Sequence, residues 1–287
     1  MTTVAAKAIA VDDPVDALMR SIRIPPRPSL LVDLQRELAE LDPSPRKIAR
    51  IIGNDVGMSG ALLKLANSPF YGAARKAKSV EQAINFLGVN TCSAMLVGLL
   101  AREAMGAEGG ALNHFWDVSA KRAQAVVFTS RKLRIAPPDI AHTFGLFCDI
   151  GVPLLMKRFP DYAATYEAAS NDPVNCFTAI EETLHQTNHA AIGCLLARNW
   201  GLSADVSWAI LLHHDYAVLE DDATDDAIRS LVALCLLAEK GIQRYHGNSH
   251  SLEWDKGGER ACMHLGLSPE EAQDLLEELH EMFDHDN

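Results

Sequence analysis

Apolar residues recur every three or four positions along most of the chain, which is the spacing of one face of an α-helix. The first such run is formed by leucines at positions 30, 31, 34, 38 and 41. The sequence contains no sustained alternation of apolar and polar residues and no Asn-Gly turn, so it does not predict a β-hairpin. The pattern predicts helices over residues 30–41, 45–53, 55–66, 80–87, 91–105, 112–133, 160–170, 176–186, 189–200, 203–213, 225–245 and from 268 onward, with one more leading into 145–151 and a short one near 14–20. We therefore expect an all-α fold.

Capping and breaking residues indicate where these helices begin and end. Ser44 precedes Pro45, and Ser79 and Ser268 each stand three positions before a Gln or Glu, as in a capping box. The prolines of residues 24–29 favour an extended entry segment. The glycine-rich residues 106–110 are the clearest internal boundary. We expect a leader at 1–23, an N-terminal helical subdomain at 24–110 and a second subdomain with a C-terminal helix at 111–287.

Composition excludes several classes of function. With 26 basic and 38 acidic residues the net charge is −12, which gives no general attraction to nucleic acid or to an anionic membrane. The basic residues near 75–78 and 131–134 are interpreted as solvated surface. The N-terminus lacks the pattern of a secretory signal, and no apolar run approaches the roughly 20 residues of a membrane span. The six cysteines form no CxxC pair and are interpreted as reduced core residues. A cytoplasmic protein is expected.

Four residues are candidate metal ligands because they stand at the ends of separate predicted helices. Asp149, within GLFCDIG (145–151), ends a predicted apolar helix, His189 begins a helix, and His213 and His214 end another. Packing of helices can bring such side chains together around an ion. For His189 alone, a helix cap or a core histidine is the more frequent role. Neighbouring rings on a helix lie about 100° apart, so only one of His213 and His214 is expected to face the same site.

The motifs of the chain resemble those of the HDOD family, the HD-related output domains of bacterial signalling. The resemblance rests on LANSPFYG (65–72), SVEQAINFLG (79–88), GLFCDIG (145–151), HAAIGCLLARNWGL (189–202) and AILLHHD (209–215), and covers residues 24–237. It implies a multi-helix bundle whose second half is related to HD phosphohydrolases and whose first half is a helical subdomain. Ser68 and Tyr71 of the first motif could contact a ligand, but turn capping and packing are the favoured roles.

An HD phosphohydrolase binds metal through a first histidine, an adjacent His-Asp pair, further histidines and a late aspartate. The resemblance places the first histidine near Val118, the pair at Cys148-Asp149, and the late aspartate near Leu236. The later histidines fall on His189 and on His213 or His214. Three main ligand positions are thus apolar or soft. A metal that activates water needs several strong ligands, so Asp149, His189, His213 and His214 are interpreted as a vestigial set.

Two functions follow as hypotheses. The first is a non-catalytic regulatory module in signal transduction, with no catalytic residue and no cofactor, that contacts protein partners in trans, does not bind nucleic acid or membrane, and leaves room for a small ligand. The alternative is a residual metal-dependent phosphohydrolase that acts on a nucleotide or phosphodiester. A relic pocket that holds a nucleotide without cleaving it is a third, weaker hypothesis. No P-loop, GxGxxG or GxSxG motif supports another enzyme class.

Overall fold

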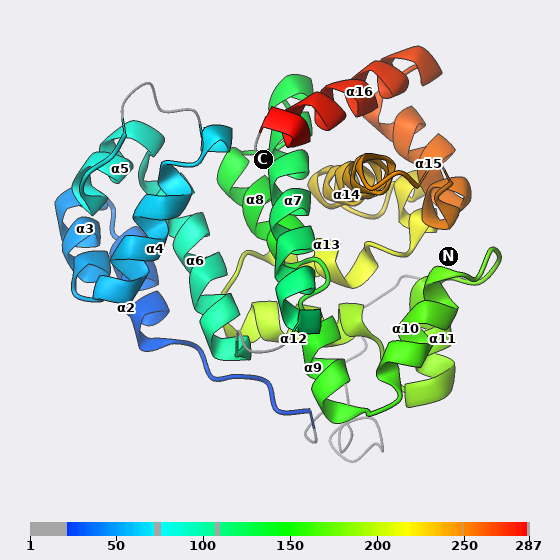
Figure 1. Ribbon diagram of the computed structural model, residues 1–287, viewed down its shortest axis with the longest axis horizontal. Coiled ribbons are helices and arrows are strands. Elements are labelled where there is room, and N and C mark those ends of the chain that lie inside the picture. The colour runs from blue at the N-terminus through cyan, green and yellow to red at the C-terminus, as the bar shows by residue number, and fades with distance from the viewer. Residues whose placement is uncertain (1–21, 72–75, 107–109, 249, 286–287) are drawn as a thin grey trace.

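The computed structural model describes residues 22–71, 76–106, 110–248 and 250–285, and these residues form helices and connecting turns without a β-strand. Figure 1 shows the N-terminal helices grouped at one end of the molecule and the C-terminal helices at the other. The expected all-α fold is therefore confirmed. The predicted helix near 14–20 and most of the expected leader lie outside the described residues.

The N-terminal helices pack around α6, which lies between them and the rest of the molecule in Figure 1. The elements of this part are α2 (Ser29–Leu38), α3 (Pro45–Gly53), α4 (Val56–Ala66), the 3₁₀ helix η1 (Pro69–Tyr71), α5 (Val80–Leu87) and α6 (Val89–Met105). The extended segment before α2 reaches the second half of the chain, where Trp200 donates its indole N–H to the carbonyl of Pro25 at 3.0 Å.

The second half is built on α7 and α8, which lie side by side, and on α14, which packs against α7. Its elements are α7 (Gly110–Leu133), α8 (Pro138–Phe147), α9 (Val152–Arg158), α10 (Tyr162–Ser170), α11 (Phe177–His185), α12 (His189–Asn199), α13 (Ala204–Leu212), η2 (Tyr216–Glu220), α14 (Asp226–Tyr245), α15 (Leu252–Leu265) and α16 (Pro269–His285). Most predicted helices are present with ends shifted by a few residues.

The predicted caps are confirmed. The hydroxyl of Ser44 accepts from the backbone N–H of Lys47, and that of Ser79 accepts from Gln82. Before α16, Ser268 and Glu271 form a complete capping box: each side chain accepts from the other residue's backbone N–H, at 3.2 and 2.8 Å. These serines satisfy backbone donors that the first helical turn leaves unpaired.

Three features differ from the sequence prediction. The first helix ends at Leu38, so Leu41 lies beyond it and is fully exposed rather than part of its apolar face. The short α9 was not predicted. Neither was α15, whose sequence contains two adjacent glycines and many charged residues. This helix is defined by its N-cap, Ser251, which accepts from the backbone N–H of Trp254, and by the burial of Gly257 and Gly258 against aromatic rings.

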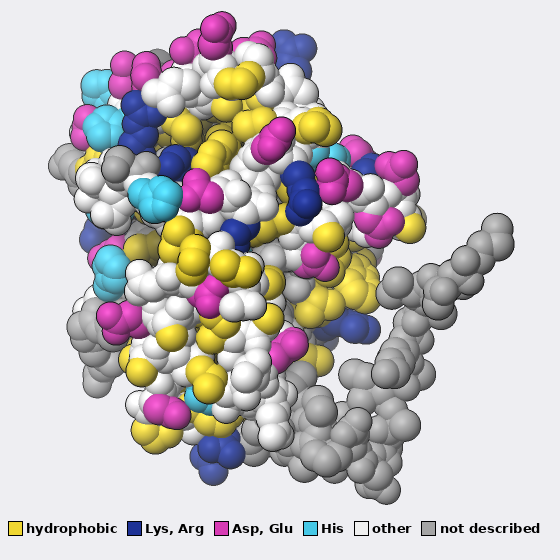
Figure 2. Space-filling model, turned by 90° about the vertical axis from the view of Figure 1, so that its right-hand side faces the viewer, with side chains coloured by type: hydrophobic (Ala, Val, Ile, Leu, Met, Phe, Trp, Pro, Cys, Tyr) yellow, Lys and Arg dark blue, Asp and Glu magenta, His cyan; other side chains and the backbone are white. Residues whose placement is uncertain are grey.

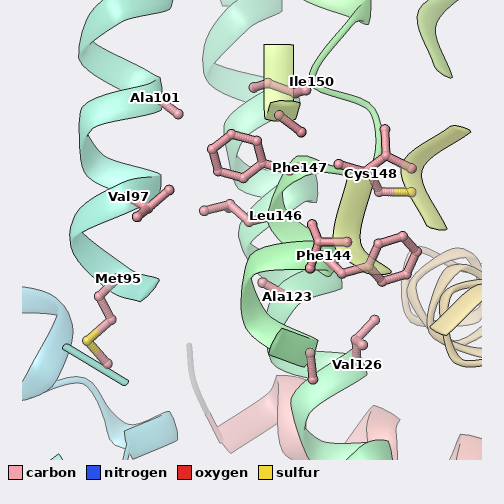
Figure 3. Close-up of a cluster of buried hydrophobic side chains, with 14 of the residues drawn as sticks. Met95, Val97, Ala101, Ala123, Val126, Phe144, Leu146, Phe147, Cys148 and Ile150 are labelled. Carbon is pink, nitrogen blue, oxygen red and sulfur yellow. The ribbon is translucent and has the colours of Figure 1, made fainter. Parts of the chain in front are cut away.

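A continuous cluster of buried apolar residues runs through both halves of the described chain. Figure 3 shows Leu146 and Phe147 of α8 pointing toward Val97 and Ala101 of α6, with Ala123 of α7 below them in this view. Gly145 allows α8 to approach α7, since a Cβ there would lie 2.8 Å from the Cα of Ala123. The core is shared by both halves and does not test the proposed division into subdomains at 106–110. That boundary includes the undescribed residues 107–109, and it stays a prediction.

The helical stretch Pro138–Arg158 is long and apolar enough to cross a membrane by length and composition alone, in contrast to the sequence expectation. Of its most apolar window, 78 % is buried within the protein. This stretch comprises α8, a turn and α9, which pack against other helices of the bundle. Its apolar character is therefore explained by the core that it helps to form.

The surface charge and the state of the cysteines match what the composition predicts. On the face drawn in Figure 2, acidic side chains are scattered among apolar and polar ones, and Lys and Arg side chains are interspersed without forming a continuous basic patch. All six cysteines are free, and four of them are buried. Burial raises the pKa of the Cys92 thiol to about 12, which keeps it protonated at neutral pH.

We expect the buried His142 of α8 to make the protein less stable as the pH falls. Burial lowers the pKa of His142 to about 4, whereas the unfolded chain should titrate near 6.5. Between these values the unfolded state takes up a proton that the folded state does not, so the free energy of unfolding decreases as the pH falls, by up to about 3 kcal/mol.

Urea unfolding of the wild type and of His142→Phe between pH 7 and pH 4 measures this effect. The variant should become progressively more stable relative to the wild type toward pH 4. His114→Phe, at an exposed position on α7, is the matched control and should follow the wild type. A constant difference between His142→Phe and the wild type across this range would contradict the prediction.

Candidate functional site

Asp149 is presented by the tight turn between α8 and α9. The turn is closed by two backbone hydrogen bonds, from the N–H of Ile150 to the carbonyl of Phe147 and from the N–H of Val152 to the carbonyl of Asp149. The carboxylate is buried, with 8 % of the residue exposed. The expectation that this stretch is an apolar helix end followed by an acid is confirmed.

His189 is the first residue of α12 and is almost completely buried. It is not the helix cap, because the side chain of Asn188 takes that role by accepting from the N–H of Ala191 at 2.7 Å. Gly151 lies directly against the backbone of His189, where a Cβ would stand 2.1 Å from the carbonyl oxygen. The absence of a side chain at position 151 therefore sets how closely the Asp149 turn approaches His189.

His213 and His214 both face the same site, which corrects the expectation that only one would do so. The two residues follow directly after the last residue of α13, Leu212, and His213 is its C-cap. Their ring centroids are 4.1 Å apart, and both residues are buried. Ligand atoms of Asp149, His189, His213 and His214 all lie within 4.8 Å of one another. The four candidates from the sequence therefore converge.

Three of these donor atoms form a compact triangle. The Nε2 atoms of His189 and His213 are 3.2 Å apart, and they lie 3.4 and 3.2 Å from Oδ1 of Asp149. A tetrahedral ion with bonds of about 2.0–2.1 Å would hold neighbouring donors roughly 3.3 Å apart. This face of the site thus has the spacing of a metal centre.

The opposite side of Asp149 is occupied by a cation that belongs to the chain. Arg122 of α7 donates from Nη2 to Oδ2 of Asp149 at 2.5 Å, and its Nε lies 3.3 Å from Oε1 of Glu239 on α14. The guanidinium is only 5 % exposed. Sequence reasoning missed both residues, because an Arg and a Glu on long helices give no local signal that they face inward.

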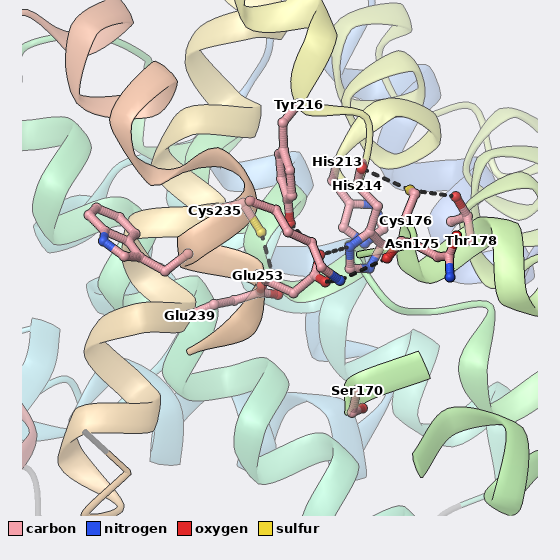
Figure 4. Close-up of polar contacts among 12 residues, drawn as sticks. Ser170, Asn175, Cys176, Thr178, His213, His214, Tyr216, Cys235, Glu239 and Glu253 are labelled. Atoms are coloured by element: carbon pink, nitrogen blue, oxygen red, sulfur yellow. Dashed lines mark hydrogen bonds and ion pairs between the residues drawn. The ribbon is translucent and has the colours of Figure 1, made fainter. Parts of the chain in front are cut away.

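Two further carboxylates orient the histidines. Glu181 of α11 is completely buried and accepts from Nδ1 of His189 at 2.7 Å and from the hydroxyl of Tyr162. Glu253 of the unpredicted α15 accepts from Nδ1 of His214 at 3.0 Å and from the hydroxyl of Tyr216 at 2.6 Å, as Figure 4 shows. Partners of this kind fix the orientation of an imidazole ring.

The charged groups of the site are paired with one another within the protein. Burial alone would raise the pKa of Asp149, but Arg122 and the hydrogen bond from His189 hold that pKa well below its usual range. Burial opposes protonation of His189, but Glu181 and Asp149 raise its pKa to about 10. Burial, with the neighbouring His214, lowers the pKa of His213 to about 4. At neutral pH an imidazolium at His189 therefore faces a neutral imidazole at His213.

The tautomers follow from these partners. His213 donates its Nδ1–H to the carbonyl of Ile210 at 2.7 Å, which leaves a lone pair on Nε2. His189 donates from Nδ1 to Glu181, and its Nε2–H points into the triangle formed with Asp149 and His213. Lys256, which donates to Glu253 at 2.6 Å, adds a third positive group. Three cations, Arg122, His189 and Lys256, thus lie among the four carboxyl groups of Asp149, Glu181, Glu239 and Glu253.

The remaining positions inferred from the resemblance are only partly as expected. Val118 lines the cavity beside Asp149, so the position expected for a first histidine does face the site. Cys148 packs against Cys235 with their sulfur atoms 3.3 Å apart. Leu236 belongs instead to a separate apolar cluster with Tyr216, so the inward position on α14 is Cys235, one residue earlier. Glu239, one turn further along, is the carboxyl that the sequence comparison missed.

The cavity next to these residues has a volume of about 150 Å³. It is lined by Val118, Arg122, Asp149, Tyr166, Ser170, Phe177, His189, His214, Glu239, Ile242, Gln243, Leu252 and Glu253. Ligand sites for drug-sized molecules usually measure about 300–1,000 Å³, so a nucleotide would not fit without rearrangement. Burial, with Asp149 adding to it, raises the pKa of Glu239 despite the opposing effect of Arg122.

The geometry fits a metal ion only in part. His189, His213 and Asp149 supply one suitable face, but the imidazolium proton and the Arg122 guanidinium already provide the positive charge there. A divalent ion would have to displace that proton and move next to a fixed cation. The residues present therefore do not fit the complete metal site of an active HD hydrolase.

Comparison with known proteins agrees with these motifs. The family model described as "HDOD domain" matches residues 24–216. The chain belongs to the HDOD family. The matched residues include Asp149, His189, His213 and His214, whereas Glu239 and Glu253 lie beyond the match.

Solved structures share the fold at low sequence identity. A "Putative phosphohydrolase" from Shewanella amazonensis SB2B aligns with a TM-score of 0.71 and 20 % identity, covering 94 % of this chain and 95 % of that one. A "Putative signal transduction protein" from Marinobacter aquaeolei VT8 aligns with a TM-score of 0.69 and 18 % identity, covering 97 % of this chain and 61 % of that one. These similarities establish the HD-like helical fold.

A curated relative is an uncharacterized protein of Treponema pallidum (strain Nichols), 25 % identical over 200 residues. The match covers 67 % of this chain and 38 % of the relative. The chain therefore spans well under half the length of that relative.

We expect Gly151→Ala to destabilise the protein and to disrupt the Asp149 turn. The backbone φ of −71° at Gly151 would suit any residue, so the effect comes from the clash of the new methyl group with the His189 carbonyl. Backbone atoms cannot move aside as side chains do, and we expect a loss of more than about 2 kcal/mol in the free energy of unfolding.

Urea denaturation measures this loss. Gly60→Ala is the control, because nothing lies within 4 Å of a Cβ at that helical position. It should be neutral or stabilising by up to about 1 kcal/mol. Equal stability of Gly151→Ala and Gly60→Ala would show that the close approach is not required.

Proposed function

We propose that this HDOD protein is a non-catalytic regulatory module, which works in signal transduction through contacts with protein partners. The observation that carries the proposal is the ion pair between Arg122 and Asp149. It places a fixed positive charge of the chain against the carboxylate that a hydrolase would use to hold its metal. The polar site then serves to fix the arrangement of α7, α8, α12 and α14.

The cavity supports the same proposal. Hydrolysis of a phosphodiester requires that an anion be bound and that negative charge on its oxygens be stabilised. Glu239 and Glu253 both line the cavity. Arg122, which supplies the guanidinium cation of the cavity wall, is already paired with Asp149 and Glu239. An anionic substrate would meet carboxylates on two sides in a space of about 150 Å³.

Metal-dependent phosphohydrolase remains the second candidate function, acting on a nucleotide or phosphodiester. The specific observation in its favour is the triangle of Asp149, His189 and His213, whose spacing suits a single ion. In that case these residues would hold the metal, with His214 nearby, and the metal would supply a polarised water. The two candidates differ in whether Arg122 excludes the metal or lies beside it.

Replacing Arg122 tests the first candidate. Arg122→Met keeps an apolar stem of similar length but leaves Asp149 without its partner, and we expect a loss of about 3–5 kcal/mol in stability without metal. Mn²⁺ or Zn²⁺ should restore part of that stability in the variant, because the charge and the space become available. The wild type should not be stabilised by the same ions. Thermal unfolding with and without metal measures both effects.

Arg198→Met, at an exposed position on α12, is the control and should behave as the wild type does. Metal content of the purified wild type and a phosphodiesterase assay with Mn²⁺, Fe²⁺ and Mg²⁺ complete the test. Stoichiometric metal in the wild type, together with hydrolysis that is lost in His213→Gln, would favour the second candidate instead.

A genetic replacement tests the regulatory role in the cell. His213→Gln removes an imidazole that any metal site would need, while its amide can still donate to the carbonyl of Ile210. We expect the variant to restore the phenotype of a deletion strain as well as the wild-type copy does, since the proposed role needs no metal chemistry. Failure of the variant at wild-type protein levels, measured by immunoblot, would contradict a non-catalytic role.

A further inference from the structure

The cavity beside Asp149 opens to solvent on one side. Among its lining residues, Ser170 is exposed, and Val118 and Leu252 are half-buried. These residues belong to α10, α7 and α15, so the opening lies between these three helices. The cavity of about 150 Å³ is therefore accessible to a small molecule from solution.

Glu239 lines this cavity with few hydrogen bonds of its own. Its side chain is 18 % exposed, and the thiol of Cys235 donates to its Oε1 at 3.8 Å. Nε of Arg122 lies 3.3 Å from the same oxygen, but this nitrogen forms no hydrogen bond with the residues that the structure describes. A carboxylate can accept about four hydrogen bonds, so Glu239 has acceptor capacity that the described residues do not use.

Each of the other three carboxylates of the site has a cation that donates to it. Glu239 instead shares Arg122 with Asp149. An ionised carboxylate that is largely buried costs free energy unless positive charge accompanies it. A proton or a bound cation can supply that charge at Glu239. The pairs in question are Asp149 with Arg122, Glu181 with His189, and Glu253 with Lys256.

The rest of the wall decides which cation fits. Rings of Tyr166 and Phe177 meet edge to face with centroids 5.1 Å apart, and Phe177 stacks on His214. Ile242 and Leu252 add aliphatic carbon. Mg²⁺ and Ca²⁺ prefer to be surrounded by oxygen ligands, whereas much of this wall consists of carbon. An organic cation matches both parts, because its charged group is attracted by carboxylates and aromatic rings while its alkyl chain covers apolar surface.

We propose that this cavity binds a small organic ammonium ion, whose NH₃⁺ group donates to Glu239 and lies beside the carboxylate of Glu253. Figure 4 shows these two side chains next to each other, from α14 and α15, and both line the cavity. The alkyl chain extends toward the opening, along Val118 and Leu252. The inference rests on the proposed function, since it requires the metal-free site in which Arg122 pairs with Asp149.

Three probes of similar shape and different charge test the proposal. They are n-butylammonium, the neutral 1-butanol and the anionic butyrate. Titration of ¹⁵N-labelled full-length protein in EDTA, followed by its amide chemical shifts, gives a dissociation constant for each probe. We expect n-butylammonium to bind roughly 10- to 100-fold more tightly than 1-butanol, which corresponds to one hydrogen bond between charged groups, and butyrate not to bind.

Glu239→Gln removes the negative charge but keeps the shape of the side chain and an oxygen that accepts from Cys235. This variant should bind n-butylammonium about ten-fold more weakly, while its affinity for 1-butanol changes little. Glu103→Gln, at an exposed position on α6 outside the cavity, is the matched control and should bind both probes as the wild type does. Val118→Phe adds a ring to the cavity wall and should weaken binding of both probes.

Four results would overturn the proposal. The first is an absence of shifts with n-butylammonium at every concentration that leaves the protein folded, which would leave a proton as the partner of Glu239. The second is equal affinity of the wild type for n-butylammonium and 1-butanol. The third is equal n-butylammonium affinity in the wild type and Glu239→Gln. The fourth is unchanged binding in Val118→Phe, which would place the probe elsewhere on the protein.

The design separates this proposal from the proposed function. If Glu239→Gln does not fold, the probe series and Val118→Phe decide. The titrations contain EDTA, so failure of the ammonium ion to bind would leave the metal response of Arg122→Met unaffected. Stabilisation of the wild type by Mn²⁺ or Zn²⁺ would instead contradict the proposed function itself.

Discussion

The buried guanidinium of Arg122 is the group on which the arrangement of the second half depends. It comes from the middle of α7, contacts Asp149 in the turn after α8 and lies against Glu239 on α14. A charge buried to this extent is tolerated only where its partners are fixed. The three helices therefore have to keep their relative positions. Asp149 is held where His189 and His213 can reach its other oxygen.

Two glycines make this arrangement sterically possible. Gly145 lets α8 lie against α7 next to Arg122, and Gly151 lets the following turn lie against the backbone of His189. Asp149, which lies between the two glycines, is thereby placed within hydrogen-bond distance of the guanidinium of Arg122 and of the imidazole rings of His189 and His213. Close packing of backbones, more than any single polar contact, brings the parts of the site together.

The site combines the spacing of a metal-binding site with positive charge that the protein itself supplies, so a metal ion is not needed to neutralise its carboxylates. The donor atoms of His189, His213 and Asp149 keep the spacing of a coordination face, and their outer partners keep the rings oriented. Yet the positive charge is supplied by Arg122 and by the proton on His189. Geometry and charge thus point to different conclusions, and the charge balance is the reason for preferring a regulatory role.

The sequence by itself determined the helical class, most helix positions, the caps at Ser44, Ser79 and Ser268, and the identity of the four candidate residues, but not their convergence. These features depend on local spacing, which is legible along the chain. Only the tertiary structure decided that His213 and His214 face one site, because the packing of the helices brings ligand atoms of both within 4.8 Å of those of Asp149 and His189. It also decided the roles of Arg122, Glu181, Glu239 and Glu253, since a charged residue on a helix does not reveal which neighbour it faces until the helices have packed.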